Sequence, residues 1–240
     1  MNKFWNWIKN EDNDRVLRID GIIAENSWFD DEISPKQFRE ELNSGSGNIT
    51  VWINSYGGDV FAAAQIYNML KEYPHKVTTR IDGIAASAAS VICMVGDTVE
   101  ISPVGAIMIH NPALGIFANS DEMKAAIRVL DEIKETIINA YEIKTKLSRE
   151  KISKLMDAET WFSAKKALEL GFVDKILFTD ENSDNAANAV MFSKMTVTDS
   201  FLNKIKKALK KQTSGVNAAQ FKKSCNFKKE CYLNGNSRIV

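Results

Sequence analysis

The chain has 240 residues, of which 45% are hydrophobic and 26% are charged. This is the composition of an ordinary globular protein, and it excludes a wholly disordered or fibrous chain. The formal net charge is zero, but residues 194–240 carry 11 lysines and arginines against two acidic residues. We therefore expect one α/β core with an excess of acidic residues, followed by a basic tail.

The sequence carries no pattern of secretion, membrane insertion or metal binding. Cys93, Cys225 and Cys231 form no Cys-x-x-Cys pair, and no apolar stretch reaches the roughly 18 residues of a membrane span. The opening MNKFWNWIKN lacks the apolar region of a signal peptide. His75 and His110, the two histidines, are far apart and suggest no ligand cluster. We expect a cytoplasmic protein with no metal or other cofactor, and no clear nucleic-acid or membrane binding by the core.

Strand and helix patterns alternate through the first part of the chain. In order, they predict a strand at 16–23, a helix from Ser34-Pro35, a strand at 48–54, a helix at 62–70 and a strand at 76–81. The strand at 48–54 is apolar and β-branched, so we expect it to be buried on both faces. This alternation predicts βαβ units on a parallel sheet.

Beyond residue 82 the pattern continues with a turn opening a small-residue helix, then strands at 98–102 and 105–110. A long amphipathic helix follows at 120–147, with its apolar stripe at Met123, Ile127, Leu130, Ile133, Ile137 and Tyr141. Two arrangements fit this helix equally well. It either projects and packs against a neighbouring subunit, or it lies along the sheet.

Near the end of the core, Ser163 is expected to cap a short helix that Gly171 ends, and a last strand is expected at 172–178. The polar stretch DENSDNAANA then reads as a linker. We divide the chain into an N-terminal segment (1–15), an enzyme domain (16–178), a linker (179–195) and a basic amphipathic tail (196–240).

Three segments could carry serine hydrolase chemistry. His110 ends an apolar strand, the position where catalytic groups of parallel sheets gather, although a structural histidine is equally compatible with it. Ser87 lies in GIAASAA, where a strand turns into a helix, although such a segment also serves for close helix packing. Gly57 and Gly58 form a turn whose backbone can approach a ligand closely, or a plain tight turn.

Taken together, INSYGGDV, GIAASAAS and MIHNP resemble the motifs of the Clp protease proteolytic subunit, in the same order and with similar spacing. FSAKKALELGFVD is similar to the family's segment after the catalytic aspartate, and the resemblance spans residues 16–178. It implies an α/β, crotonase-like or Clp-type fold of repeated βαβ units with a long projecting helix. It also implies a serine endopeptidase that needs no ATP for the chemistry itself.

Carried over to this sequence, the resemblance makes Ser87 the nucleophile and His110 the general base. The backbone N–H groups of Gly58 and Ala88 form the oxyanion hole. The family's aspartate falls on Glu159, while Asp157 lies two residues earlier, so either carboxylate is a candidate for the third member.

Within the family, SYGGDVFAA, MDAETWFSA and ELGFVD look most like the proteases of phage and prophage head maturation. This subtype implies protein or peptide substrates, among them capsid or scaffold proteins, and a homo-oligomeric ring. Two departures from the family pattern stand out: Tyr56 replaces a proline, and the N-terminal segment matches no axial loop. Docking to an ATPase partner therefore stays open.

Other functions remain to be weighed against this one. A crotonase-type acyl-CoA enzyme would need no Ser–His pair, and a signal-peptide peptidase would use a serine–lysine dyad. An inactive structural component of a phage head would keep the fold alone. In the tail, SFLNKIKKALKK puts apolar residues on one face and lysines on the other, so it is either a solvated extension or a contact to another subunit or a capsid partner.

Overall fold

A computed structural model describes residues 3–9, 15–23 and 35–179, all of which belong to one compact unit, Met1–Glu181. The expected linker (179–195), apart from its first residue, and the basic tail (196–240) lie outside the described residues. Eight strands and six helices make up the described part. The strands are β1 (Trp5–Lys9), β2 (Arg15–Ile23), β3 (Ile49–Gly58), β4 (Val77–Ala86), β5 (Thr98–Ile101), β6 (Ala106–Ile109), β7 (Thr160–Ser163) and β8 (Lys175–Ile176). The helices are α1 (Pro35–Asn43), α2 (Val60–Lys71), α3 (Ala88–Cys93), α4 (Ser120–Thr145), α5 (Arg149–Asp157) and α6 (Ala164–Glu169).

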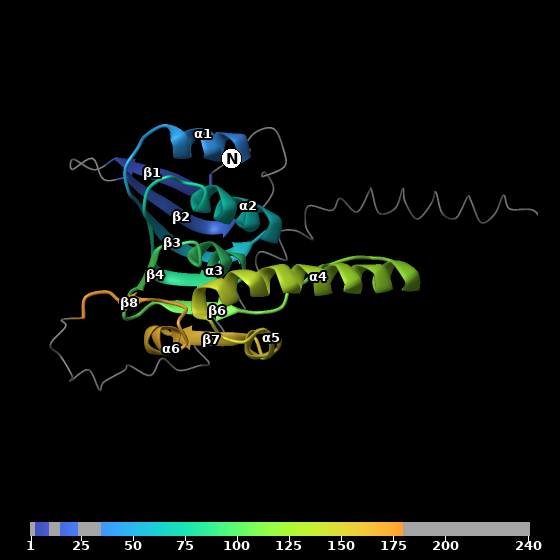
Figure 1. Cartoon of the computed structure of the whole chain (residues 1–240). Coiled ribbons are helices and arrows are strands. Elements are labelled where there is room, and N and C mark those ends of the chain that lie inside the picture. Colours follow the sequence, from blue (N-terminus) through green and yellow to red (C-terminus); the bar gives the residue numbers. More distant parts are fainter. Residues whose placement is uncertain (1–2, 10–14, 24–34, 180–240) are drawn as a thin grey trace, which may run out of the picture. The chain divides into compact units, whose positions relative to one another are not determined.

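One sheet runs in the order β1-β2-β3-β4-β5-β8, and β6 and β7 branch from it at β4 (Figure 1). The first half of β4 pairs with β5, whereas Ile84–Ala86 of its second half pair with Ala106–Met108 of β6. Pairing is parallel throughout except for β1 with β2 and β6 with β7. The predicted βαβ units on a parallel sheet are therefore present, and β4 is the strand at which the sheet forks.

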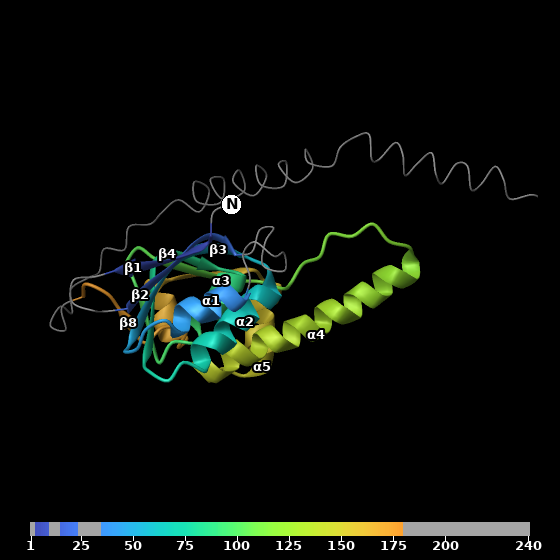
Figure 2. The same ribbon diagram turned by 90° about the horizontal axis from the view of Figure 1, so that it is seen from above.

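Helices α1, α2 and α3 lie on the same side of the sheet (Figure 2). Along β3 the inward side chains Ile49, Val51, Ile53 and Ser55 are buried, while Thr50 and Trp52 are only partly covered. The prediction that this strand is buried on both faces was wrong, because helices cover one face alone. On the other face the guanidinium of Arg80 lies 5.4 Å from the Trp52 ring centroid and binds Glu100.

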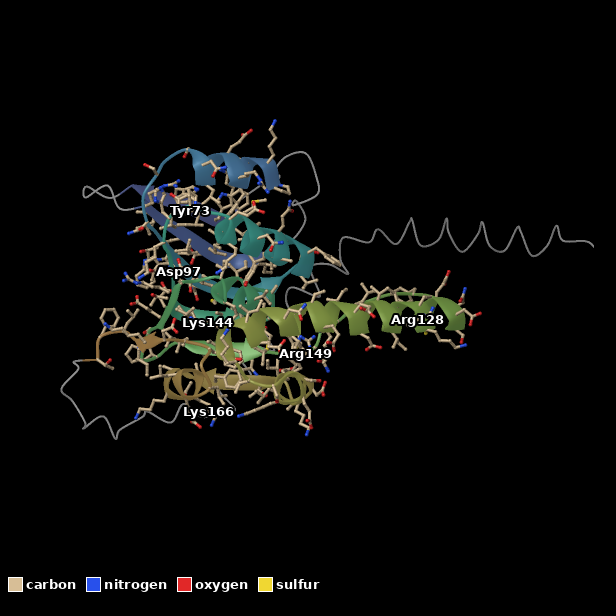
Figure 3. The ribbon with its side chains drawn as sticks, in the orientation of Figure 1. Tyr73, Asp97, Arg128, Lys144, Arg149 and Lys166 are labelled. Carbon is tan, nitrogen blue, oxygen red and sulfur yellow. The ribbon has the colours of Figure 1, made fainter. Side chains whose placement is uncertain are left out.

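Helix α4 is buried only near its C-terminal end, at Ile137, Ile138, Ala140 and Tyr141. Met123 and Ile127, which belong to the predicted apolar stripe, are exposed. The first half of the helix extends away from the sheet, with Arg128 on this free part (Figures 1 and 3). Arg149 donates to Asn139 and Glu142 of α4 and so fixes the α4–α5 junction. The expectation of a projecting helix is confirmed over its first half.

Several elements differ from the sequence-based expectation. Strand β1 lies in the segment assigned no structure, because the buried Trp5 packs on Phe38 of α1. Helix α5 and strand β7 were not predicted. The strand expected at 172–178 is reduced to β8, and the strands expected to end at 54 and 81 continue through Gly58 and Ala86. Helix α6 begins and ends as expected. Ser163 is its N-cap, and Gly171, with a φ of 78°, follows its C-cap.

The end of β3 lies directly against the segment after β4. Gly57 has a φ of 97°, and a Cβ placed on it would lie 2.7 Å from the carbonyl oxygen of Ala86 and 2.9 Å from the nitrogen of Ala88. A side chain at this position would therefore be strained in φ and would collide with backbone that has little freedom to move.

We predict that Gly57→Ala lowers the free energy of unfolding by roughly 3 kcal/mol, from the left-handed φ and the steric overlap together. Gly115→Ala is the matched control, because an added Cβ there has no atom within 4 Å. Urea unfolding of both variants measures the difference. Equal stability of the two would mean that Gly57 does not approach the Ala86–Ala88 backbone as described.

Candidate active site

Ser87 stands between β4 and α3 in a backbone conformation that is rare for residues other than glycine. Its φ is 54° and its ψ is −128°. The N–H group of Ser87 donates to the carbonyl of Met108 in β6 at 2.9 Å, and its carbonyl accepts from the N–H of Ser90 at 2.9 Å. Strained residues of this kind persist only where neighbouring contacts hold them, and they cluster at functional sites. In the turn that was predicted to expose this hydroxyl, Ser87 is therefore the residue with the unusual backbone conformation, and two backbone hydrogen bonds hold it.

His110 follows β6 and reaches Ser87 because the second half of β4 pairs with β6. Parallel pairing brings the carboxyl ends of the two strands side by side, and the distance from His110 Nε2 to Ser87 Oγ is 2.7 Å. Partial burial of the imidazole lowers the pKa of His110, and the nearby negative charge of Glu159 opposes this by raising it. A neutral imidazole with its proton on Nδ1 accepts a hydrogen bond from the serine hydroxyl at Nε2.

The glycine turn at the end of β3 faces the same point. A Cβ placed on Gly57 would lie 2.7 Å from Ser87 Cβ and 2.9 Å from the nitrogen of Ala88. Gly58 and Ala88 line one pocket together with Ser87 and His110. All four residues expected to form the nucleophile, base and oxyanion hole are thus brought together. Tyr56, which takes the place of the family's proline, is partly exposed on β3.

Ser55 holds the glycine turn in place and was not singled out from the sequence. This residue is fully buried, donates from its hydroxyl to the carbonyl of Gly21 at 2.5 Å and accepts from the N–H of Gly57 at 3.1 Å. Its signal in the sequence is a polar residue at the inward position that follows Ile49, Val51 and Ile53 along the strand.

Asp157 and Glu159, the two candidate third residues, behave differently. The carboxylate of Asp157 accepts from Asn111 at 2.9 Å and from Lys134 at 2.5 Å, and these contacts lower the pKa of Asp157. Glu159 has a φ of 45°, and its charge acts on His110. Within the described residues neither carboxylate forms a hydrogen bond with His110, so Glu159 acts on it through charge alone.

Beside Ser87 lies a pocket of about 360 Å³ between the glycine turn, α3 and α4. Apolar side chains form most of its wall, among them Val60, Phe61, Val91, Leu130, Ile133 and Ile137. Tyr141 also lines it. The arrangement offers a substrate an apolar cavity within reach of a serine hydroxyl and an imidazole.

The remaining reactive side chains lie elsewhere. His75 is exposed next to Tyr73, and burial strongly raises the pKa of the Cys93 thiol. Across residues 3–9, 15–23 and 35–179, no group of three or more His, Cys, Asp or Glu residues is placed to hold a metal ion. In the same part of the chain, no helix is both long and apolar enough to cross a membrane.

Comparison with known proteins matches residues 17–180 to the Clp protease family. The ATP-dependent Clp protease proteolytic subunit 1 of Chlamydia muridarum is 36% identical over 143 residues, which are 58% of this chain and 74% of that protein. Proteolytic subunit 2 of Thermobifida fusca is 32% identical, over 68% of this chain and 83% of that one. A solved structure of a ClpP1 mutant from Listeria monocytogenes superposes with a TM-score of 0.57 at 27% identity, covering 67% of this chain and 89% of the other.

The family match runs from within β2 to beyond β8, and together with the relatives and the solved structure it confirms both the expected α/β fold and the expected class of enzyme. The chain belongs to the Clp protease family and is a serine endopeptidase.

Proposed function

We propose that this protein hydrolyses peptide bonds with Ser87 as nucleophile, His110 as general base and Glu159 as the acid that supports the imidazolium. The observation that carries the proposal is the 2.7 Å contact between His110 Nε2 and Ser87 Oγ. The N–H groups of Gly58 and Ala88 are the donors of the oxyanion hole. Each such donor is worth about 3 kcal/mol of transition-state stabilisation in serine proteases.

In the proposed reaction Ser87 Oγ attacks the scissile carbonyl carbon while its proton passes to His110 Nε2. The carbonyl oxygen becomes an oxyanion between the two N–H donors. The C–N bond then breaks, and the proton on His110 goes to the leaving amine. A water molecule attacks the resulting ester, gives a proton to His110, and release of the acid returns that proton to Ser87.

The pocket next to Ser87 supports a preference for substrates with a large apolar side chain before the scissile bond. Most of its wall is apolar, and Asp59 is a charged residue of the lining outside the catalytic groups, so burying an aliphatic or aromatic side chain there removes apolar surface from water. A negatively charged side chain would lose its hydration without gaining a partner.

Glu159 and Asp157 can be separated by the pH dependence of kcat/KM. The active base is neutral His110, so the rate falls as the pH drops through the pKa of His110. Because Glu159 raises that pKa, Glu159→Gln moves the acid limb to lower pH. The same variant lowers the plateau by about 10–100-fold, less than the roughly 10⁴-fold loss for a buried triad aspartate, since Glu159 is exposed.

Asp157→Asn is the matched variant, and it leaves the acid limb where it is, because the contacts of Asp157 are with Asn111 and Lys134. A pH–rate profile of both variants with one fluorogenic peptide decides between them. If Asp157→Asn shifts the limb and Glu159→Gln does not, the third member is Asp157.

The serine mechanism itself is tested by fluorophosphonate labelling followed by intact-mass measurement. We expect one adduct on the wild-type protein and none on Ser87→Ala or His110→Ala, because phosphonylation needs both the hydroxyl and its base. A crotonase-type enzyme would keep its activity in Ser87→Ala. Absence of an adduct on correctly assembled wild-type protein would point instead to an inactive structural component.

Homo-oligomerisation forms part of the proposal. The free half of α4 exposes Met123, Ile127 and Val129, and the segment before it exposes Leu114 and Phe117. Met123 and Ile127 lie one helical turn apart and share a face of α4, and exposed apolar patches mark interaction sites. We assign this surface to contacts between copies of the chain in a ring assembly, as the family resemblance implies.

The substrates that we propose are capsid or scaffold proteins of a phage head. The support is the resemblance of three sequence segments, SYGGDVFAA, MDAETWFSA and ELGFVD, to the proteases of phage head maturation. A second candidate is a general proteolytic subunit served by an ATPase, which the printed names of the relatives favour.

Incubation of the purified protein with the capsid or scaffold precursor of the same phage separates these candidates. We expect cleavage at defined sites without ATP, read by intact mass, and no cleavage by Ser87→Ala. Degradation that appears only after an unfoldase ATPase and ATP are added would assign the second role.

A further inference from the structure

Two hydroxyl groups are buried together behind the nucleophile, and the mechanism above does not use them. Ser90 in α3 and Tyr141 in α4 are almost completely inaccessible to solvent, and their oxygen atoms lie 2.7 Å apart. A hydroxyl buried among apolar side chains is unfavourable unless it is hydrogen-bonded, so this pair has a defined arrangement.

The carbonyl group of Ser87 decides which of the two hydroxyls donates to the other. Ser90 Oγ lies 2.6 Å from the carbonyl oxygen of Ser87, and a carbonyl only accepts. The one hydroxyl proton of Ser90 is therefore given to Ser87, and the phenol of Tyr141 is the donor to Ser90 Oγ. Burial raises the pKa of Tyr141, which keeps the phenol protonated as this direction requires.

The carbonyl held in this way belongs to the peptide plane that also contains the N–H group of Ala88. In a planar trans peptide the C=O and N–H bonds point in opposite directions, so fixing one fixes the other. The Ser87 carbonyl also accepts from the N–H of Ser90 at 2.9 Å. Hydrogen bonds to a carbonyl polarise the peptide group and strengthen its N–H as a donor.

We propose that Ser90 and Tyr141 are positioning residues that aim the Ala88 N–H at the developing oxyanion through the hydrogen-bonded chain Tyr141–Ser90–Ser87. This inference rests on the proposed roles of Ser87 and Ala88. Neither Ser90 nor Tyr141 touches the reacting atoms through its hydroxyl. Tyr141 also lines the pocket with its ring, and Tyr141→Phe keeps that ring, so the hydroxyl can be removed with the pocket wall retained.

The test compares Tyr141→Phe, Ser90→Ala and the double variant on a fluorogenic peptide with an apolar residue before the scissile bond. We expect kcat to fall about fivefold in Tyr141→Phe and about 20-fold in Ser90→Ala, less than the loss of a whole oxyanion donor, with KM unchanged. The double variant should equal Ser90→Ala, because Tyr141 acts only through Ser90. Ser90→Thr keeps the hydroxyl and should restore most of the rate.

The affinity for a ligand that forms an oxyanion in the active site distinguishes a positioning role from an effect on stability. A peptide aldehyde forms a tetrahedral adduct with the active serine, so its affinity should fall by the same factor as kcat/KM in each variant. Tyr73→Phe is the matched control: Tyr73 is also buried, donates to Gly47 and accepts from Arg15, and lies by α1 and α2 (Figure 3). The Tyr73→Phe variant should be less stable than the wild-type protein, with unchanged kcat and unchanged affinity for the aldehyde.

The possible outcomes are distinct. Wild-type kcat and aldehyde affinity in Tyr141→Phe and Ser90→Ala, with normal fluorophosphonate labelling, would overturn the positioning role and leave the proposed function intact. Parallel losses in Tyr73→Phe and Tyr141→Phe would also overturn it, because they would show an effect of stability alone. A wild-type protein that takes up neither fluorophosphonate nor aldehyde would overturn the proposed function, and this inference with it.

Discussion

The site depends on the fork at β4. A strand that paired with one neighbour along its whole length would continue next to β5, and the end of β6 would have no place beside Ser87. Because the pairing changes from β5 to β6 within the strand, the two segments that carry Ser87 and His110 end at the same point of the sheet. The N–H of Ser87, the proposed nucleophile, donates to the carbonyl of Met108 in β6 and holds the two strand ends together at this residue.

Close backbone approach is the second requirement, and it explains why glycine and small residues surround the serine. The β3 turn reaches the nucleophile turn with no side chain between them, so that Gly57 lies against Ala86–Ala88. Ser55 below this turn and Ser90 beyond the nucleophile each bind a backbone group that belongs to the site. The backbone of the proposed oxyanion hole is thus hydrogen-bonded to buried hydroxyls, whereas the cavity beside it is mostly apolar.

Helix α4 contributes both to the pocket and to the exposed apolar surface. Its buried end supplies Ile137 and Tyr141 to the pocket, and its exposed half carries the apolar surface that we assign to contacts between copies. Lys134, between these parts, binds Asp157, which in turn binds Asn111 next to His110. A shift of the helix would therefore change both the pocket wall and the contacts of the loop that holds His110, the proposed base.

The sequence by itself determined the alternating strands and helices, the capped ends of α6, the nucleophile and base candidates and the family, because these depend on local patterns and on motifs that are short and ordered. It did not reveal α5, β7 or the pairing of β1, since short elements with few residues have weak periodicity and are stabilised by packing. The uncovered face of β3 also escaped prediction, because the neighbours that cover a strand come from distant parts of the chain.

Only the tertiary structure decided which side chains act on one another. From the sequence, Glu159 was the favoured third member and Asp157 the alternate; in the fold the charge of Glu159 raises the pKa of His110, whereas Asp157 binds Asn111 and Lys134. Ser55, Ser90 and Tyr141 read as ordinary strand or helix residues until their partners, 34, 3 and 51 positions away, were placed beside them. The contacts of Ser55 with Gly21 and of Tyr141 with Ser90 are set by the packing of whole elements, and local sequence carries no record of them.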